Sequence, residues 1–337
     1  MSLPQVEAAV EDLRHAHREL LGVVDSLSDS DWERYVPYGD WTVKDMVAHA
    51  IGDMSPSGAG LIHAGVLTPE FIESTSRVFD VRARNASIVE ERRRYTKEDL
   101  RQLLFESHDA MIEYALILNE SNLPVLAYAV PMGPEYEIKV EDWLWHGYHD
   151  RQHADDIRRA VEMDWQPEKL TFLPEIDAQI GLVQRYREGL LRAIYSVADD
   201  AWDEPATPGG WTYKQDLAHI ASNDLRPQTR LRAILGEAGD EETAAILRTD
   251  EWNQARVDER RDWSVRRLVD DLAANRHQTL KLLSRLQPDH LSATIAFGSG
   301  DKVSLTDYVG HIGRHDAMHA GHLVPASRAR RFAIRTQ

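Results

Sequence analysis

Six of the 15 histidines in this 337-residue chain fall into two sets of three with the same spacing. In the first half, His149 and His153 are four residues apart, and His49 lies far upstream. On an α-helix, residues four apart share one face with Cβ atoms about 6 Å apart, so two imidazoles can bind one cation. A third imidazole from another helix leaves coordination positions open for water or substrate, which is typical of a catalytic metal. The second half repeats the set with His219, His315 and His319.

The metal interpretation depends on this recurrence. Two histidines four apart on a helix arise often by chance, and the alternative is that all six are ordinary core or surface residues. That alternative does not predict that three histidines recur together while most of the surrounding sequence diverges. We therefore predict one three-histidine metal site in each half.

An internal repeat underlies the two sets. Trp41-Thr42-Val43-Lys44, which precedes His49, returns 170 residues later as Trp211-Thr212-Tyr213-Lys214 before His219. His149-Asp150 returns 166 residues later as His315-Asp316, so the register drifts by only four residues. The same order of elements therefore occurs twice, which indicates duplication.

Four other polar residues are candidates for the pocket around each site. His146 and His311 lie one helical turn before the first histidine of each pair. Either can line the pocket as a general acid or base, or it is a partly exposed helix residue. Asp53 and Asn223 lie four residues beyond the upstream histidine of each half. They are candidates for holding a ligand or contacting substrate, or they are ordinary polar residues near a helix end.

Two further recurring features are interpreted as structural. Asp150 and Asp316 directly follow a candidate ligand and so point about 100° away from it, where a salt bridge or interhelical contact is expected. Four tryptophans are predicted to cover the bundle ends as core: Trp32, Trp41, Trp202 and Trp211.

Helical periodicity dominates each half, and alternating strand patterns are nearly absent. In the first half, an apolar stripe over 13–27 marks one helix and Thr42 is a plausible N-cap for the next, with Asp45 three residues on. A third helix opens at 96–99 and a fourth runs from about 140 to 163. The second half is expected to repeat them at 176–197, 212–235, 264–286 and 305–323.

This pattern predicts an all-α protein of two tandem four-helix bundles, over 5–163 and 172–325. The segment 164–169, with a proline and mixed charges, is the expected junction. Glycine- and proline-bearing stretches at 131–134 and 297–300 precede the last helix of each copy and are interpreted as matching turns or short hairpins.

Composition excludes several classes of function. A net charge of -17 disfavours binding to a phosphate backbone, so no nucleic-acid partner is expected. The chain has no cysteine, so any metal must be held by His, Asp or Glu. No apolar stretch of signal-peptide type or of about 18 residues occurs, and we expect a cytoplasmic protein with no membrane partner.

With these residues in view, each half resembles the DinB-like superfamily of four-helix metal-binding bundles, which includes mycothiol-dependent maleylpyruvate isomerases and bacillithiol transferases. The stretches from Trp41 to His49 and from His149 to Ala154, with their repeats, carry the resemblance. It implies zinc or nickel, one ion per half, bound by the six histidines. Such bundles often pair as homodimers, which implies that the two halves pack as an intramolecular pseudo-dimer and leaves the whole chain as monomer or homodimer.

The resemblance implies a metal-dependent enzyme acting on an electrophilic or strained small molecule, in detoxification or self-resistance. The nucleophile is either metal-activated water, giving hydrolysis, or a low-molecular-weight thiol cosubstrate, giving transfer or isomerisation. The alternative is a non-catalytic protein that sequesters a small molecule or metal. Turnover with excess substrate separates these two classes.

Overall fold

A computed structural model describes residues 3–52, 81–124, 126–129, 137–140, 144–206, 210–247, 249–297 and 301–326. The chain divides into two compact units between Pro167 and Glu168, a point that lies inside the expected junction at 164–169. Each unit is treated by itself, and the pseudo-dimer stays a prediction.

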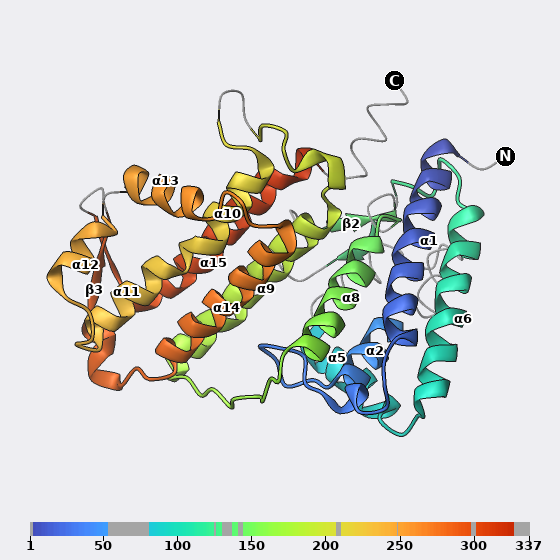
Figure 1. Cartoon of the computed structure of the whole chain (residues 1–337), viewed down its shortest axis with the longest axis horizontal. Coiled ribbons are helices and arrows are strands. Elements are labelled where there is room, and N and C mark those ends of the chain that lie inside the picture. Colours follow the sequence, from blue (N-terminus) through green and yellow to red (C-terminus); the bar gives the residue numbers. More distant parts are fainter. Residues whose placement is uncertain are drawn as a thin grey trace. The chain divides into compact units, whose positions relative to one another are not determined.

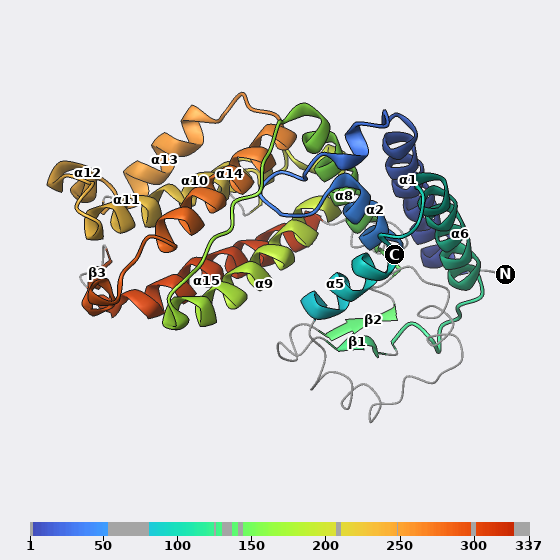
Figure 2. The same ribbon diagram turned by 90° about the horizontal axis from the view of Figure 1, so that it is seen from below.

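The first unit is a helical bundle in which α1 packs against α6 and α8, and α2 packs against α5, α6 and α8 (Figures 1 and 2). Its core consists of buried aliphatic side chains such as Leu20, Val47, Leu104 and Ile157. The elements are α1 (Pro4–Asp25), η1 (Asp31–Glu33), α2 (Val43–Gly52), α5 (Val81–Arg92), α6 (Lys97–Leu116), β1 (Leu126–Ala129), β2 (Glu137–Lys139) and α8 (Gly147–Glu162).

The second unit repeats this plan, with α9 packed along α15 and α10 packed against α13, α14 and α15. Figure 1 shows α9, α14 and α15 as long neighbouring helices. The elements are α9 (Pro174–Ser196), η3 (Asp199–Ala201), α10 (Tyr213–Asn223), α11 (Leu225–Ile234), α12 (Asp240–Ala245), α13 (Thr249–Glu259), α14 (Val265–Leu283), η4 (Pro288–Ser292), β3 (Thr294–Ala296), β4 (Lys302–Ser304), α15 (Leu305–Leu323) and η5 (Val324–Ala326).

Helix caps fix the start of both helices that carry the upstream histidines. The Asp45 amide donates to Thr42 Oγ1 at 3.1 Å, and the Thr42 amide donates back to Asp45 Oδ2 at 3.2 Å. Thr212 and Gln215 form the same capping box before α10. Because a cap fixes the first helical residue, it also fixes which face His49 and His219 occupy one to two turns later.

The all-α prediction is confirmed, with two small antiparallel hairpins added. β1 pairs with β2 and β3 pairs with β4, on either side of the two predicted turns, whose residues 131–134 and 298–300 lie outside the described residues. None of the described helices combines the length and apolar character that a bilayer span requires.

Two sequence-based boundaries need correction, and helices also lie in the long connections, where none was predicted. The last helix of the first half begins at Gly147 and not near 140, because a turn occupies 144–146. The helix predicted over 212–235 is divided at Asp224 into α10 and α11. Pro227 explains the division, since it donates no hydrogen bond to residue 223 and its ring crowds that carbonyl. The connection between α2 and α6 contains α5, which carries Asn85. The connection between α11 and α14 contains α13, which carries Asn253.

Gly313 on α15 provides a test of how closely α9 and α15 approach. A Cβ atom there would lie 2.8 Å from Tyr186 Cδ2 and 3.0 Å from Val183 Cα. We expect Gly313→Ala to lower the free energy of unfolding of the second unit by about 1–3 kcal/mol, as overpacking does.

Gly321 on the same helix is the matched control, because a Cβ atom there meets nothing within 4 Å. Gly321→Ala should raise stability by about 0.5–1 kcal/mol, the usual helix-propensity gain. Urea unfolding followed by circular dichroism measures both. Equal effects of the two substitutions would contradict the close approach of the helices.

Candidate metal centres

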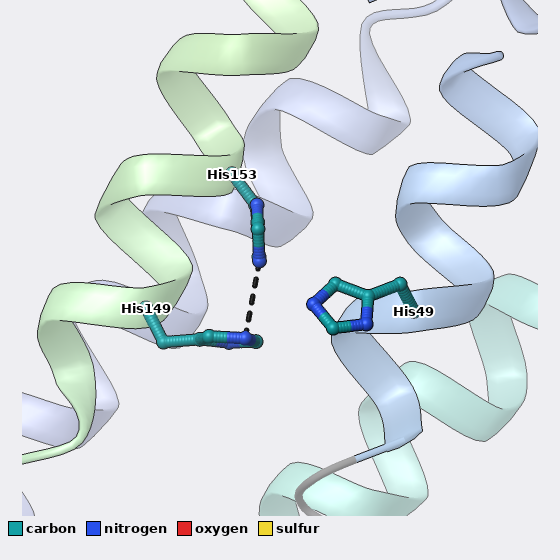
Figure 3. A group of neighbouring side chains, drawn as sticks. All are labelled: His49, His149 and His153. Carbon is teal, nitrogen blue, oxygen red and sulfur yellow. Dashed lines mark hydrogen bonds between the residues drawn. The ribbon is translucent and has the colours of Figure 1, made fainter. Parts of the chain in front are cut away.

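The structure brings together the three histidines predicted in the first half. His49 comes from α2, and His149 and His153 come from successive turns of α8 (Figure 3). The two α8 imidazoles lie 3.1 Å apart between their Nε2 atoms. The centroid of the His49 ring is 5.3 Å from that of His149 and 5.0 Å from that of His153. One nitrogen of each ring lies within 4.8 Å of the others, so all three can reach one cation.

The second half repeats this geometry. His219 comes from α10, and His315 and His319 come from α15. Their ring centroids lie 5.3 Å, 4.9 Å and 4.5 Å apart, nearly the separations of the first set. Two helical crossings of the same form therefore produce two three-nitrogen clusters from diverged sequences.

Burial keeps the imidazoles in the form that binds metal. His49, His149, His153, His219 and His319 are all buried in the described structure. Burial, followed by the neighbouring histidines, lowers the pKa of His49 well below its ordinary value, and burial with His319 lowers the pKa of His219 to about 4. Neutral imidazoles at neutral pH offer free lone pairs. A set of three imidazole nitrogens suits a divalent transition metal such as Zn²⁺ or Ni²⁺.

Each cluster has a carboxylate beside the second histidine of its pair, but the two carboxylates come from different positions. In the first half, His153 Nδ1 lies 3.3 Å from Asp156 Oδ2, one turn along the same helix. In the second half, His319 Nδ1 lies 3.0 Å from Asp216 Oδ1 on α10. The first contact is a hydrogen bond and the second lies within ion-pair distance. A carboxylate that accepts from Nδ1 holds the tautomer whose Nε2 lone pair is free for a cation. The counterpart of Asp216 in the first half is Met46, so the carboxylate has changed helix between the copies.

A pocket of about 310 Å³ opens beside the second cluster. Its lining includes two ligands of that cluster, His219 and His315, together with Asn223 and His311. The structure therefore places Asn223 and His311 where the sequence predicted them to lie, without testing their roles. Partial burial, with Arg314 and Arg230 nearby, lowers the pKa of His311, which leaves it neutral at neutral pH.

Two arginines that the sequence analysis missed, Arg226 and Arg230 of α11, line the same pocket. Arg230 is buried, donates to the Tyr308 hydroxyl at 2.9 Å and lies over the Phe297 ring. No acidic residue lines the pocket in the described part of the chain, so the pocket is positive in an otherwise acidic protein. The repeat gave no signal for these two arginines, because at the shift of 170 residues their counterparts are Pro56 and Gly60.

The other predicted polar residues lie at the start of α8, at contacts between helices or outside the described residues. His146 caps the start of α8, and its ring centroid is 4.9 Å from that of His149. Asp53 lies outside the described residues. Asp316 makes the interhelical contacts expected of it, accepting from Arg187 Nε at 2.9 Å and from Arg276 Nη2 at 3.1 Å. Asp150 contacts His17 of α1 and His108 of α6, and its Oδ1 also lies 4.0 Å from Nδ1 of the adjacent His149.

Of the four tryptophans, two lie beside the candidate metal centres, with rings tilted against a histidine, and do not serve only as core. The Trp41 and Trp211 rings lie 5.0 Å and 5.2 Å from His49 and His219. Trp32 and Trp202 are buried in the core as predicted. The first residue of each repeated WTxK stretch therefore borders a histidine cluster, whereas the sequence predicted only a packing role for it.

Fold and clusters together define a tandem helical bundle with a histidine cluster in each copy. Comparison with known families gives this class a name. A family model described as the mycothiol maleylpyruvate isomerase N-terminal domain matches residues 13–161, and one described as the DinB superfamily matches residues 182–323. The chain thus carries two tandem DinB-like domains, as its motifs predicted. No curated protein and no solved structure matches the chain.

Asp216→Asn tests whether the carboxylate supports metal binding. The amide cannot stabilise the Nδ1 proton of His319 as a carboxylate does, so zinc affinity of the second site should fall about 10- to 100-fold. Asp156→Asn should weaken the first site instead, and each variant serves as the control for the other. Competition with a chromophoric chelator measures both affinities. Unchanged affinity in both variants would contradict this role.

Acid destabilisation of the metal-free protein tests the burial of His219. Because the folded-state pKa of His219 is about 4, the unfolded chain takes up this proton first as the pH falls below about 6.5. Stability present above pH 6.5 is therefore lost towards pH 4, by at most about 1.4 kcal/mol per pH unit for this group. His219→Gln should make the slope shallower, whereas His15→Gln, at an exposed position, should not. Urea unfolding of chelator-treated protein gives the slopes, and identical slopes in all three proteins would contradict the prediction.

Proposed function

We propose that the protein is a metal-dependent enzyme that adds a low-molecular-weight thiol to an electrophilic small molecule. The outcome is either transfer of the thiol to that molecule or isomerisation of the molecule. Each histidine cluster binds one divalent cation, Zn²⁺ or Ni²⁺. The observation that carries the proposal is the convergence of three imidazoles in each half, with a pocket beside the second cluster that two of its imidazoles line. Three nitrogen ligands leave coordination positions open towards that pocket.

The choice of thiol over water has two supports. The family description that matches the first unit names mycothiol, and the chain itself contains no cysteine, so the thiol must arrive as a cosubstrate. A divalent cation held by the cluster lowers the pKa of a bound thiol or water and so supplies a nucleophile at neutral pH.

The pocket of the second unit favours a substrate that carries a negative charge. Arg226 and Arg230 provide fixed positive charge, and the Tyr308 hydroxyl orients Arg230. Guanidinium groups match carboxylates in shape and charge. In this proposal His311, which lines the pocket and has a lowered pKa, accepts a proton from the thiol or returns one to the product.

We infer a role in detoxification or self-resistance in the cytoplasm. A positive pocket beside an activated thiol suits the removal of reactive anionic molecules. Thiols are kept reduced in that compartment.

Substitution of one ligand per cluster tests the proposal. His153→Ala should remove the metal of the first cluster and His319→Ala that of the second, because each set lies within its own unit. Elemental analysis counts the metals. Thiol consumption with a panel of electrophiles, each in excess, measures turnover, and His319→Ala should abolish the part contributed by the second site.

The same assay separates the other functions. Turnover that needs no thiol would replace the proposal with hydrolysis. A single stoichiometric binding event without turnover would replace it with sequestration. Retention of both metals in the two alanine variants would refute the clusters as metal sites.

Arg230→Gln tests the preference for a charged substrate. Loss of a charge-assisted hydrogen bond corresponds to about 1.5–3 kcal/mol, so KM for an anionic substrate should rise about 10- to 100-fold. KM for a neutral analogue should change little. Arg232→Gln is the matched control, because Arg232 lies on the same helix and pairs with Glu242. Equal changes for charged and neutral substrates would contradict the anion preference.

A further inference from the structure

A third cluster of metal-ligand side chains lies inside the first unit. His17 of α1, His108 of α6 and Asp150 of α8 meet there, with exposed fractions of 4%, 2% and 0%. Asp150 Oδ2 lies 3.2 Å from His17 Nε2 and 3.6 Å from His108 Nε2. The two imidazoles stack with centroids 3.5 Å apart, which brings both rings to the same carboxylate oxygen.

The polar atoms of this cluster lack hydrogen bonds. Both ring nitrogens of His17 and of His108 and both carboxylate oxygens of Asp150 make none within the described part of the chain. Buried polar groups in folded proteins are nearly always satisfied, and a group of them left open in one place indicates a bound ion or water.

The charge of the cluster is also unbalanced. Burial lowers the pKa of His17 to about 3 and also lowers that of His108, so both imidazoles are neutral at neutral pH. No lysine or arginine pairs with the Asp150 carboxyl group among the described residues, where its ion-pair contacts are to histidines. A buried carboxyl group of this kind needs a partner.

In the second half, the carboxylate at the position equivalent to Asp150 has its charge neutralised by arginines. By the repeat, His17 corresponds to Arg187, His108 to Arg276 and Asp150 to Asp316. Arg187 and Arg276 both bond to the Asp316 carboxylate. The carboxylate is therefore neutralised by fixed cations in one copy and faces two neutral metal ligands in the other.

We propose that His17, His108 and Asp150 bind a divalent transition-metal ion of the zinc class, which links α1, α6 and α8. Two imidazole nitrogens and one carboxylate oxygen are a common donor set for Zn²⁺ and its neighbours and a poor one for Mg²⁺ or Ca²⁺. Ligand atoms of tetrahedral zinc lie about 3.3 Å apart, close to the 3.2 Å and 3.6 Å found here.

This ion has a different role from the ion of the second histidine triad. All three of its ligands are buried, whereas His315 of the second triad is only half-buried and lines a pocket. A closed site stabilises the fold and does not act on substrate. The inference does not rest on the proposed function.

Zinc counting on the full chain tests this site. We expect three zinc ions per wild-type chain and two in His108→Arg, in which the arginine supplies the charge that Arg276 supplies to Asp316. Treatment with a chelator should lower the melting temperature of the first unit in wild-type protein and much less in His108→Arg. His153→Ala, which removes a triad ligand, should lose one zinc independently, so the double variant should retain one.

The deciding result for this site is the loss of one zinc ion per chain in His108→Arg, whatever number of zinc ions the wild-type chain binds. If the triads bind no metal, wild-type protein should hold one zinc and His108→Arg none. That result would refute the proposed function and support this site. A zinc count unchanged by His108→Arg, with His153→Ala still losing one, overturns this site and keeps the triads. Should His108→Arg fail to fold, Asp150→Asn, which keeps the side-chain size and removes the charge, carries the same expectation.

Discussion

The close approach of the second helix to the last helix sets the functional geometry of each bundle. Only at this approach can one imidazole from α2 or α10 meet two from α8 or α15, with ring centroids about 5 Å apart. The approach requires that the start of the second helix be fixed, which the capping boxes at Thr42 and Thr212 achieve. It also requires small or absent side chains where the last helix meets the first, as Gly147 and Gly313 provide.

The two copies keep this geometry while they exchange the residues that support it. A carboxylate serves the second histidine of each pair, from Asp156 on the last helix in one copy and from Asp216 on the second helix in the other. The physical requirement is an acceptor near Nδ1, and any element that borders the ring can supply it. Supporting residues therefore diverge after duplication more freely than the imidazoles themselves.

Charge distribution links the fold to the proposed chemistry. The chain carries a net charge of -17, yet the pocket of the second unit is lined by Arg226 and Arg230 without an acidic residue among its described lining. A local positive field in an acidic protein selects small anions that reach the pocket and repels polyanions from the rest of the surface. A metal ion bound by the second histidine cluster would strengthen this preference for anions.

The sequence by itself determined the helical class, the duplication and the six histidines, because helix periodicity and a repeated motif are local signals that survive divergence. It also determined that Asp316 turns away from the cluster, since residues adjacent on a helix point about 100° apart. Only the tertiary structure decided that Asp216, Arg230 and the His17 cluster lie where they do. These residues have no local pattern: their surroundings depend on which helices touch, and Pro227 redirects the chain between α10 and α11 in a way that periodicity alone did not predict.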